Sequence, residues 1–145
     1  MDAQHARRAA AQINDLIVDL WITTERNGPR YDEFDLSSQQ HAVLSHIVSQ
    51  PEITPNELAP APGVTRGAIS QHLGALEQAG YISRERSERD RRVHVLRLEP
   101  LGERYRDALQ QFEKYTVDRY LERLSSSDIT EIVAALQKLQ AAFAD

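Results

Sequence analysis

Cysteine is absent from this sequence of 145 residues. Its absence excludes disulfide bonds, thiolate zinc sites, cysteine nucleophiles and switches based on thiol oxidation. No apolar run approaches the ~18–20 residues of a membrane span, and the N-terminal residues lack the apolar stretch of a secretory signal. We therefore expect a cytoplasmic protein without a membrane partner, with the length of about one domain.

Basic residues are fewer than acidic ones: the sequence has 17 Lys and Arg against 22 Asp and Glu, which gives a net charge of −5. Taken as an average, this balance argues against a nucleic-acid partner. The charge is unevenly distributed, however, since residues 63–97 carry 7 basic and 4 acidic side chains and both flanking segments are acidic. A local patch of this kind can attract nucleic acid even on an acidic protein. Alone, it is more often a solvated arginine-rich hairpin.

Two segments near the start have the three- and four-residue apolar spacing of amphipathic helices. The first is predicted to end at Asn27-Gly28-Pro29, because glycine suits a left-handed cap and proline cannot continue a helix. The second begins at a capping box, in which Ser37 is the cap and Gln40 reaches back. Its apolar stripe stops before Pro51.

The strongest local signal is the segment Thr54–Glu57, which predicts the start of a short helix. Threonine is its cap, proline occupies the first helical position, and glutamate closes a capping box. Pro60 and Pro62 should end this helix early, because each removes a backbone donor. Thr65 caps the next helix, which is expected to end at Gly80.

A period of two replaces the helical period after this point, and it predicts a β-hairpin from strands at residues 81–86 and 92–98. Pro100 then opens a long helix, and Ser125 with Asp128 forms a box that caps a final one. The order of elements predicts a mainly α fold with a small β-hairpin wing (α+β), a winged helix-turn-helix.

Apolar stripes also mark the helices at both ends of the chain, where a monomer would struggle to bury them. We expect a single domain, 1–145, in which residues 36–99 form the winged helix-turn-helix and residues 1–30 and 100–145 form a helical dimerisation region. The apolar residues of the first and final helices should lie in the interface of a homodimer: Ile13, Leu16, Ile17, Ile129, Ile132, Val133, Leu136 and Phe143.

Four short motifs follow one another in the middle of the chain: V-T-R at 64–66, L-x-x-L-E-x-x-G at 73–80, D-x-R at 90–92, and Leu98-Glu99. In order and spacing they resemble the MarR family of bacterial transcription regulators, over residues 36–102. The flanking helices fit that family's dimerisation region. The resemblance implies a homodimeric regulator that binds a near-palindromic operator in double-stranded DNA, a ligand-responsive repressor rather than an enzyme.

Three features depart from the family pattern. Pro60 and Pro62 stand where the family usually has a helical turn, so we expect that helix to be shortened or kinked. Glu99 replaces the usual threonine cap after the second strand. His41 occupies a position where an aromatic residue is common.

The candidate DNA contacts of the recognition helix are Thr65, Arg66, Gly67, Ser70 and Gln71, which lie on or beside the face opposite its apolar stripe. Arginine can pair with guanine and glutamine with adenine, so Arg66 and Gln71 are the expected base readers. Thr65 and Ser70 suit phosphate oxygens. Gly67 allows close backbone approach. The alternative is a merely exposed helix with ordinary polar residues.

The candidate contacts of the wing are Arg86, Arg89, Asp90, Arg91 and Arg92. The resemblance assigns to Arg92 the entry into a narrow minor groove, where the negative potential is enhanced. Asp90 would orient its guanidinium, while Arg89 and Arg91 would approach phosphates. Alternatively, Asp90 and Arg92 pair simply to stabilise the hairpin.

Many relatives in the family release DNA when a small phenolic or anionic molecule binds beside the dimerisation helices. The candidate residues for such a cavity are Trp21, His41, Tyr105 and Tyr115, which could equally be ordinary core or interface residues.

No cofactor, metal site or catalytic residue is expected. The five histidines lack metal-ligand spacing, and no nucleophile elbow or glycine-rich phosphate loop occurs. The rival to a DNA-binding regulator is therefore a winged-helix module that binds an acidic protein partner and has no specific DNA target.

Overall fold

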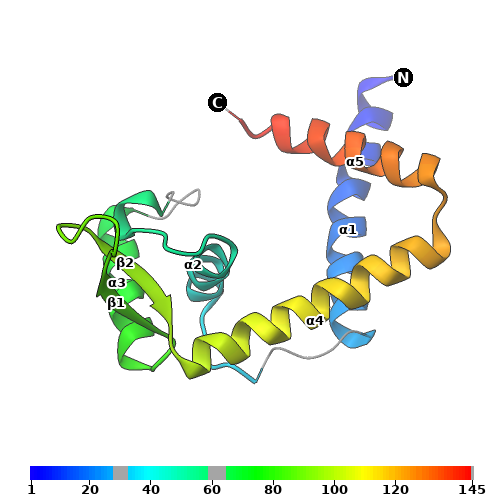
Figure 1. Cartoon of the computed structure of the whole chain (residues 1–145). Coiled ribbons are helices and arrows are strands. Elements are labelled where there is room, and N and C mark those ends of the chain that lie inside the picture. Colours follow the sequence, from blue (N-terminus) through cyan, green and yellow to red (C-terminus); the bar gives the residue numbers. More distant parts are fainter. Residues whose placement is uncertain (28–32, 59–64, 145) are drawn as a thin grey trace. The chain divides into compact units, whose positions relative to one another are not determined.

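The structure is a computed structural model and describes residues 1–27, 33–58 and 65–144 (Figure 1). Helices dominate, with one short 3-10 turn and two strands. In chain order the elements are α1 (Ala3–Asn27), α2 (Ser38–Ser49), η1 (Pro55–Glu57), α3 (Arg66–Gln78), β1 (Ile82–Arg86), β2 (His94–Leu98), α4 (Pro100–Arg123) and α5 (Ser126–Ala141). This is the order that the sequence predicted, including the winged-helix hairpin.

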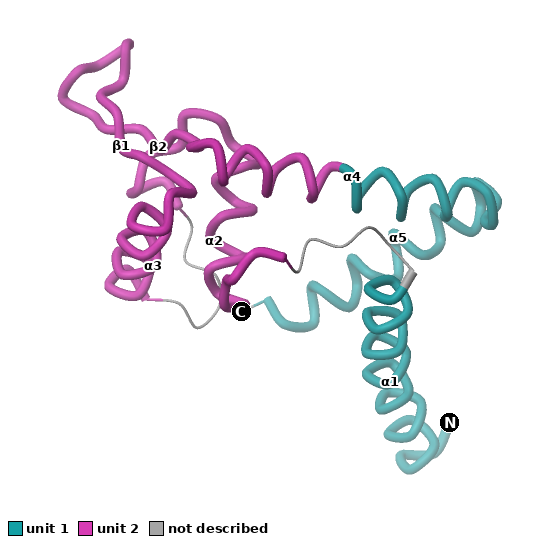
Figure 2. Tube along the Cα trace, turned by 90° about the horizontal axis from the view of Figure 1, so that it is seen from below, with its two compact units in different colours: residues 1–30, 111–145 teal, residues 31–110 magenta. Residues whose placement is uncertain are grey.

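The chain forms two compact units (Figure 2). We call residues 31–110 the winged-helix lobe, and residues 1–30 with 111–145 the helical unit. The first turns of α4 belong to the lobe. The reason is packing: Tyr105 is 1% exposed in the lobe's core, and Leu101, Ala108 and Leu109 pack against that core.

The lobe's core collects buried side chains from α2, α3, the hairpin and α4: Phe34, Val43, Leu44, Ile47, Ile53, Leu58, Ile69, Leu73, Leu76, Tyr81, Ile82, Leu96 and Tyr105. Gly102 allows α4 to approach the hairpin, because a Cβ at this position would lie 2.1 Å from the carbonyl oxygen of Tyr81. The core thus fixes α3 and the strands against one rigid support.

Three helices begin at the capping residues that the sequence predicted. Ser37 caps α2 in a complete capping box with Gln40, and Thr65 caps α3 by accepting the N–H of Ala68 at 3.1 Å. A second complete box, formed by Ser125 and Asp128, begins α5. These caps satisfy backbone donors that the first turn of a helix leaves unpaired.

The segment at Thr54 differs from the prediction of a short helix closed by a capping box. Only a single 3-10 turn, η1, follows Thr54, because Leu58 already has extended backbone and its side chain enters the core. The Thr54 hydroxyl accepts the Glu57 N–H at 3.2 Å and donates to the Glu57 carboxylate at 3.0 Å, so Glu57 does not reach back to the backbone. Pro60 and Pro62 lie outside the described residues, as do Gly28 and Pro29.

The hairpin is antiparallel, with Ile82 opposite Leu98 and Arg86 opposite His94. Both strands begin later than predicted. β1 begins after Tyr81, whose N–H closes the end of α3 by donating to the Leu76 carbonyl at 3.0 Å, next to Gly80 at φ 85°. β2 begins at His94 because the preceding residues form a turn, in which the Val93 N–H donates to the Asp90 carbonyl at 3.0 Å.

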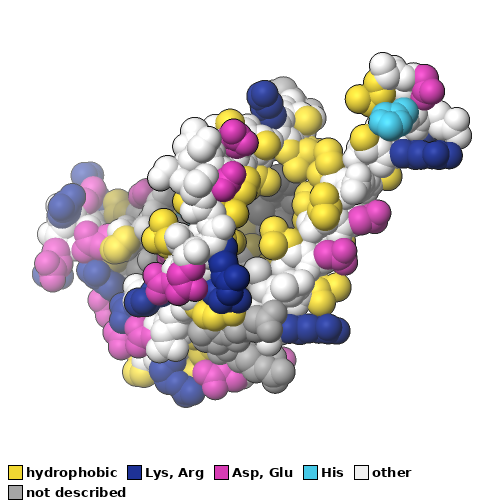
Figure 3. Space-filling model, turned by 90° about the vertical axis from the view of Figure 1, so that its right-hand side faces the viewer, with side chains coloured by type: hydrophobic (Ala, Val, Ile, Leu, Met, Phe, Trp, Pro, Cys, Tyr) yellow, Lys and Arg dark blue, Asp and Glu magenta, His cyan; other side chains and the backbone are white. Residues whose placement is uncertain are grey.

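The helical unit consists of α1, the second half of α4, and α5. Within its described residues no side chain of α1 or α5 is buried, and apolar side chains stand out on its surface (Figure 3). Of the residues predicted for the dimer interface, Ile129 is half-buried, and Phe143 lies in a turn beyond the end of α5 rather than in the helix. None of the described helices is both long and apolar enough to cross a membrane.

Candidate nucleic-acid interface

The recognition helix α3 separates its residues into a buried face and an open face. Ile69, Leu73 and Leu76 lie in the core. The five predicted contacts all lie on the exposed side: Thr65, Arg66, Gly67, Ser70 and Gln71. The structure therefore brings the predicted base readers and phosphate donors together on a single accessible surface.

Two contacts that the sequence did not single out hold α3 in place. His72 Nε2 lies 2.9 Å from the Gln39 side-chain oxygen on α2, and Glu77 forms an ion pair with Arg84 on β1. The second contact joins the recognition helix to the wing. Neither could be found from local spacing, because each joins residues of different elements.

The tip of the wing is organised by Asp90. Its carboxylate accepts the backbone N–H of Arg92 at 3.1 Å and the Nε–H of the same residue at 3.2 Å. The Arg92 side chain is 91% exposed. One carboxylate thus contacts both the backbone of the turn and the guanidinium of Arg92.

The arginines of the basic segment fall into two groups. In the first group, Arg84 is paired with Glu77, Arg92 with Asp90 at 3.2 Å, and Arg97 lies 3.0 Å from Glu52 and 3.4 Å from Glu85. Within the described ranges, no carboxylate forms an ion pair with the second group: Arg66, Arg86, Arg89 and Arg91. The unbalanced positive charge is therefore concentrated at the start of α3 and on the wing.

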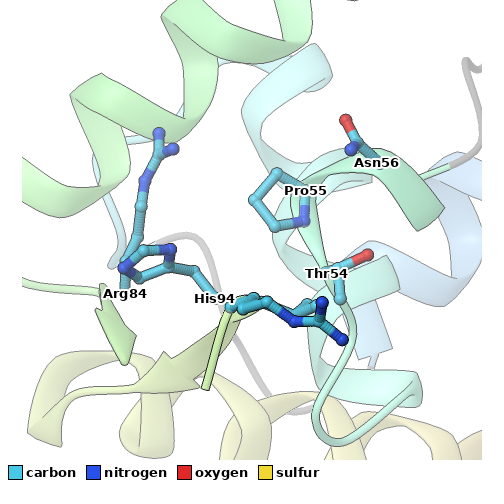
Figure 4. A pocket seen from close by; sticks show the side chains of 7 residues that line it. Thr54, Pro55, Asn56, Arg84 and His94 are labelled. Atoms are coloured by element: carbon cyan, nitrogen blue, oxygen red, sulfur yellow. The ribbon is translucent and has the colours of Figure 1, made fainter. Parts of the chain in front are cut away.

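A groove of about 530 Å³ separates η1 from the hairpin (Figure 4). Residues 54–56 line one side, and Arg84 with residues 92–94 line the other. A smaller hollow of about 80 Å³ lies between η1 and the start of α3, where Asn56 and Pro55 lie close to Arg66 and Ser70. The η1 turn therefore lies between the recognition helix and the wing.

The predicted effector residues lie in both units. In the lobe, His41 Nδ1 is 3.0 Å from the Tyr105 hydroxyl, and Phe34 packs edge-on against the Tyr105 ring. Burial lowers the pKa of His41. In the helical unit, Trp21 is 58% exposed, and Tyr115 borders a cavity of about 110 Å³ with threonines of α1 and α4, Arg119 and Tyr120.

Within the described part of the chain, the structure places no group of three or more His, Asp or Glu side chains where they could hold a metal ion.

Comparison with known proteins agrees with this geometry. The model of the MarR family matches residues 34–93. The HTH-type transcriptional regulator BilQ of Clostridium symbiosum is 30% identical over 95 residues, a match that spans 65% of this chain and 65% of that relative's length. Among solved structures, Streptococcus pneumoniae FabT in complex with DNA has a TM-score of 0.69 and 27% identity, with 97% of this chain and 96% of that chain covered.

A MarR-like transcriptional regulator from Thermotoga maritima has the same fold, with a TM-score of 0.74 and 20% identity over 100% of this chain and 99% of that one. The fold and the exposed helix beside a basic hairpin define a winged helix-turn-helix protein. Over residues 34–93 the chain is similar to the MarR family, and the BilQ and Thermotoga maritima proteins that it resembles are named as transcriptional regulators.

Proposed function

We propose that this chain is a homodimeric transcriptional regulator that binds a near-palindromic operator in double-stranded DNA and acts as a repressor. The observation that carries the proposal is the open face of α3, where Arg66 and Gln71 are exposed beside the wing. Among the described residues, only Arg92 of the four wing arginines at 86, 89, 91 and 92 has a carboxylate partner. The DNA complex of the related FabT supports DNA as the partner. Bacterial DNA as partner implies that the regulator acts in the cytoplasm.

The proposed contacts divide into base reading and phosphate binding. Arg66 and Gln71 read base edges in the major groove, while Thr65 and Ser70 contact phosphates. Gly67 permits close approach of the helix to DNA. On the wing, Arg92 enters the minor groove, held by Asp90, and Arg86, Arg89 and Arg91 contribute phosphate contacts.

A second copy of the chain is the proposed partner of the helical unit. Its predicted interface residues in α1 and α5 remain exposed or half-exposed in the single chain: Ile13, Leu16, Ile17, Ile129, Ile132, Val133 and Leu136. Covering them across a two-fold axis would bury upwards of ~2,000 Å² in total. The same axis would place two recognition helices on half-sites about one helical turn, ~10 base pairs, apart.

We also propose that a small phenolic or anionic effector releases the DNA. The cavity beside Tyr115 supports this proposal, because Arg119 and the Tyr120 ring combine a cation with aromatic surface there. Trp21, His41 and Tyr105 remain the other candidate contacts. Phenol and benzoate, tested for displacement of bound DNA, probe the two chemical classes.

Selection from a pool of random duplexes, followed by sequencing, tests the main proposal. We expect a shared, near-palindromic motif with two half-sites. Recovery of no shared motif would contradict sequence-specific binding and would favour the winged-helix module that recognises an acidic protein partner.

A further inference from the structure

The groove between η1 and the hairpin connects the two elements that are proposed to contact DNA. Its η1 side includes Pro55 and Asn56, and these two residues also border the hollow beside Arg66 at the start of α3. Its other side is the wing, from Arg84 on β1 to residues 92–94 in the turn and at the start of β2. A DNA strand that meets both the recognition helix and the wing therefore passes over this groove.

The side chains of the groove supply donors and no acid. Figure 4 shows Arg84 and His94 on the hairpin side, across the opening from Pro55 on the η1 side. Asn56 is exposed, and His94 is exposed on β2. Among the described residues that line the groove, none carries a carboxylate.

Both arginines of the groove are held in a way that leaves donors available. Glu77 contacts the Nε of Arg84, and Asp90 contacts the Nε of Arg92. No carboxylate within the described ranges pairs with the terminal nitrogens of either guanidinium. A guanidinium has five N–H donors in a fixed fork, so a carboxylate on one side leaves the others free for a phosphate.

We infer that this groove binds the sugar-phosphate backbone of DNA, with Arg84, Asn56 and His94 donating to phosphate oxygens. The inference rests on the proposed function and adds a phosphate site between the base-reading helix and the wing. Phosphate contacts fix the register of a protein on DNA and carry no sequence information directly. The groove therefore sets affinity for every sequence rather than choice among sequences.

A matched pair of arginines tests this inference. Arg84 and Arg97 both lie on the hairpin and both pair with glutamate, but only Arg84 lines the groove. Binding is measured against salt on a duplex selected from the random pool and on a scrambled duplex. Arg84→Gln should weaken both duplexes by the same factor, and the slope of log K against log salt should become shallower by about 0.9 per subunit. Arg97→Gln should leave the slope unchanged.

A second pair tests the opposite wall of the groove. Asn56→Asp places a negative charge beside the proposed phosphate, and Gln110→Glu adds the same charge on an exposed part of α4 in the same lobe. Only Asn56→Asp should reduce the affinity, by about tenfold or more, since it replaces a donor to a charged group by a repulsive one. Thermal melting of each variant confirms that the fold is retained.

Duplexes with single uncharged methylphosphonate linkages then locate the contact. At one position, the methylphosphonate should weaken DNA binding by the wild type. The same linkage should not further weaken DNA binding by Arg84→Gln. Identical profiles for the two proteins, or equal behaviour of Arg84→Gln and Arg97→Gln, would overturn the groove while leaving DNA binding intact. Inorganic phosphate titrated at constant ionic strength should not compete, and competition that Arg84→Gln abolishes would instead indicate a site for a small phosphate. A wild type that binds no duplex would overturn the proposed function as well.

Discussion

The winged-helix lobe and the helical unit differ in how far their apolar side chains are buried. In the lobe, Leu44 and Tyr105 belong to a continuous buried core. In the helical unit, large apolar side chains such as Leu121 and Leu136 are 65% and 55% exposed. The lobe can therefore be stabilised by its own burial of apolar surface, whereas the described residues of the helical unit leave much of their apolar surface exposed in the single chain.

Local helix signals do not account for this difference. α2 in the lobe and α5 in the helical unit both begin with a complete serine capping box. Both also carry apolar stripes of helical period. What differs is packing: residues of α2 share a buried core with α3 and the hairpin, while α5 has no buried residue within the described part of the chain. Capping starts a helix, but packing decides whether a unit is complete.

The largest effect is expected where the second copy is proposed to bind. Leu136→Asp should place an unpaired carboxylate in the interface, at a cost of several kcal/mol. Light scattering should then show a monomer of 16.4 kDa, and operator binding should collapse although α3 is unchanged. Gln137→Asp, an exposed position of the same helix, is the control and should leave both intact. A wild type that is itself monomeric and still binds a palindrome tightly would contradict the dimer.

The next prediction compares how much a buried side chain of the lobe and an exposed side chain of the helical unit contribute to the free energy of unfolding. In the Leu136→Asp background, Leu44→Ala should lower the free energy of unfolding by about 2–5 kcal/mol, because it leaves a cavity in the lobe's core. Leu121→Ala in the same background should change it by no more than about 0.5 kcal/mol, as expected at an exposed site. Urea titration measures both. A comparable loss for Leu121→Ala would show that the helical unit has a core of its own.

The sequence predicted those features that depend on neighbouring residues. Ser37, Thr65 and Ser125 were recognised as caps because each bonds a backbone group within three residues. The inward face of α3 followed from its period. The burial of Tyr105 could not be predicted in this way, because nothing local shows that it enters a core formed mostly by α2, α3 and the hairpin.

Ion pairs were the least predictable part of the candidate site. Arg84 and Arg97 looked like members of one basic patch, yet both are paired with carboxylates. Their partners, Glu77 and Glu52, come from α3 and from the turn before η1, so the pairing follows from tertiary structure alone. Fewer arginines than the sequence suggests are therefore available as unpaired cations.

A smaller effect should distinguish an arginine that reads bases, Arg66, from one that binds phosphate, Arg89. Arg66→Ala should weaken operator binding by about 1–3 kcal/mol and relax the sequence preference at one position in each half-site. Arg89→Ala should weaken all sequences alike and make the salt slope shallower by about one unit per half-site. Binding to selected and scrambled duplexes provides the measurement. Equal losses on both duplexes for Arg66→Ala would contradict its assignment as a base reader.

The smallest effect concerns acid, to which the two units should respond in separate pH ranges. Burial lowers the pKa of His41 in the lobe, so the folded lobe binds fewer protons there than the unfolded chain below the ordinary histidine value of 6.5. The contribution of His41 to stability is therefore complete above this pH and declines as the pH falls below it. In the helical unit, hydrogen bonds from Ser125 lower the pKa of Asp128, so its contribution to stability is complete above the ordinary carboxyl value of 3.8 and declines as the pH falls below that value.

Melting temperatures measured as a function of pH should distinguish the effect of His41 from that of Asp128. His41→Phe keeps an aromatic ring against Tyr105 and removes the titrating group, so the variant should lose less stability than the wild type as the pH falls below 6.5. His72→Asn leaves the His41–Tyr105 contact in place and should follow the wild-type profile. Asp128→Asn should affect only the profile in stronger acid, because the protonation that destabilises the α5 cap can no longer occur. If His41→Phe and the wild type fall in parallel, the acid response of the lobe does not arise at His41.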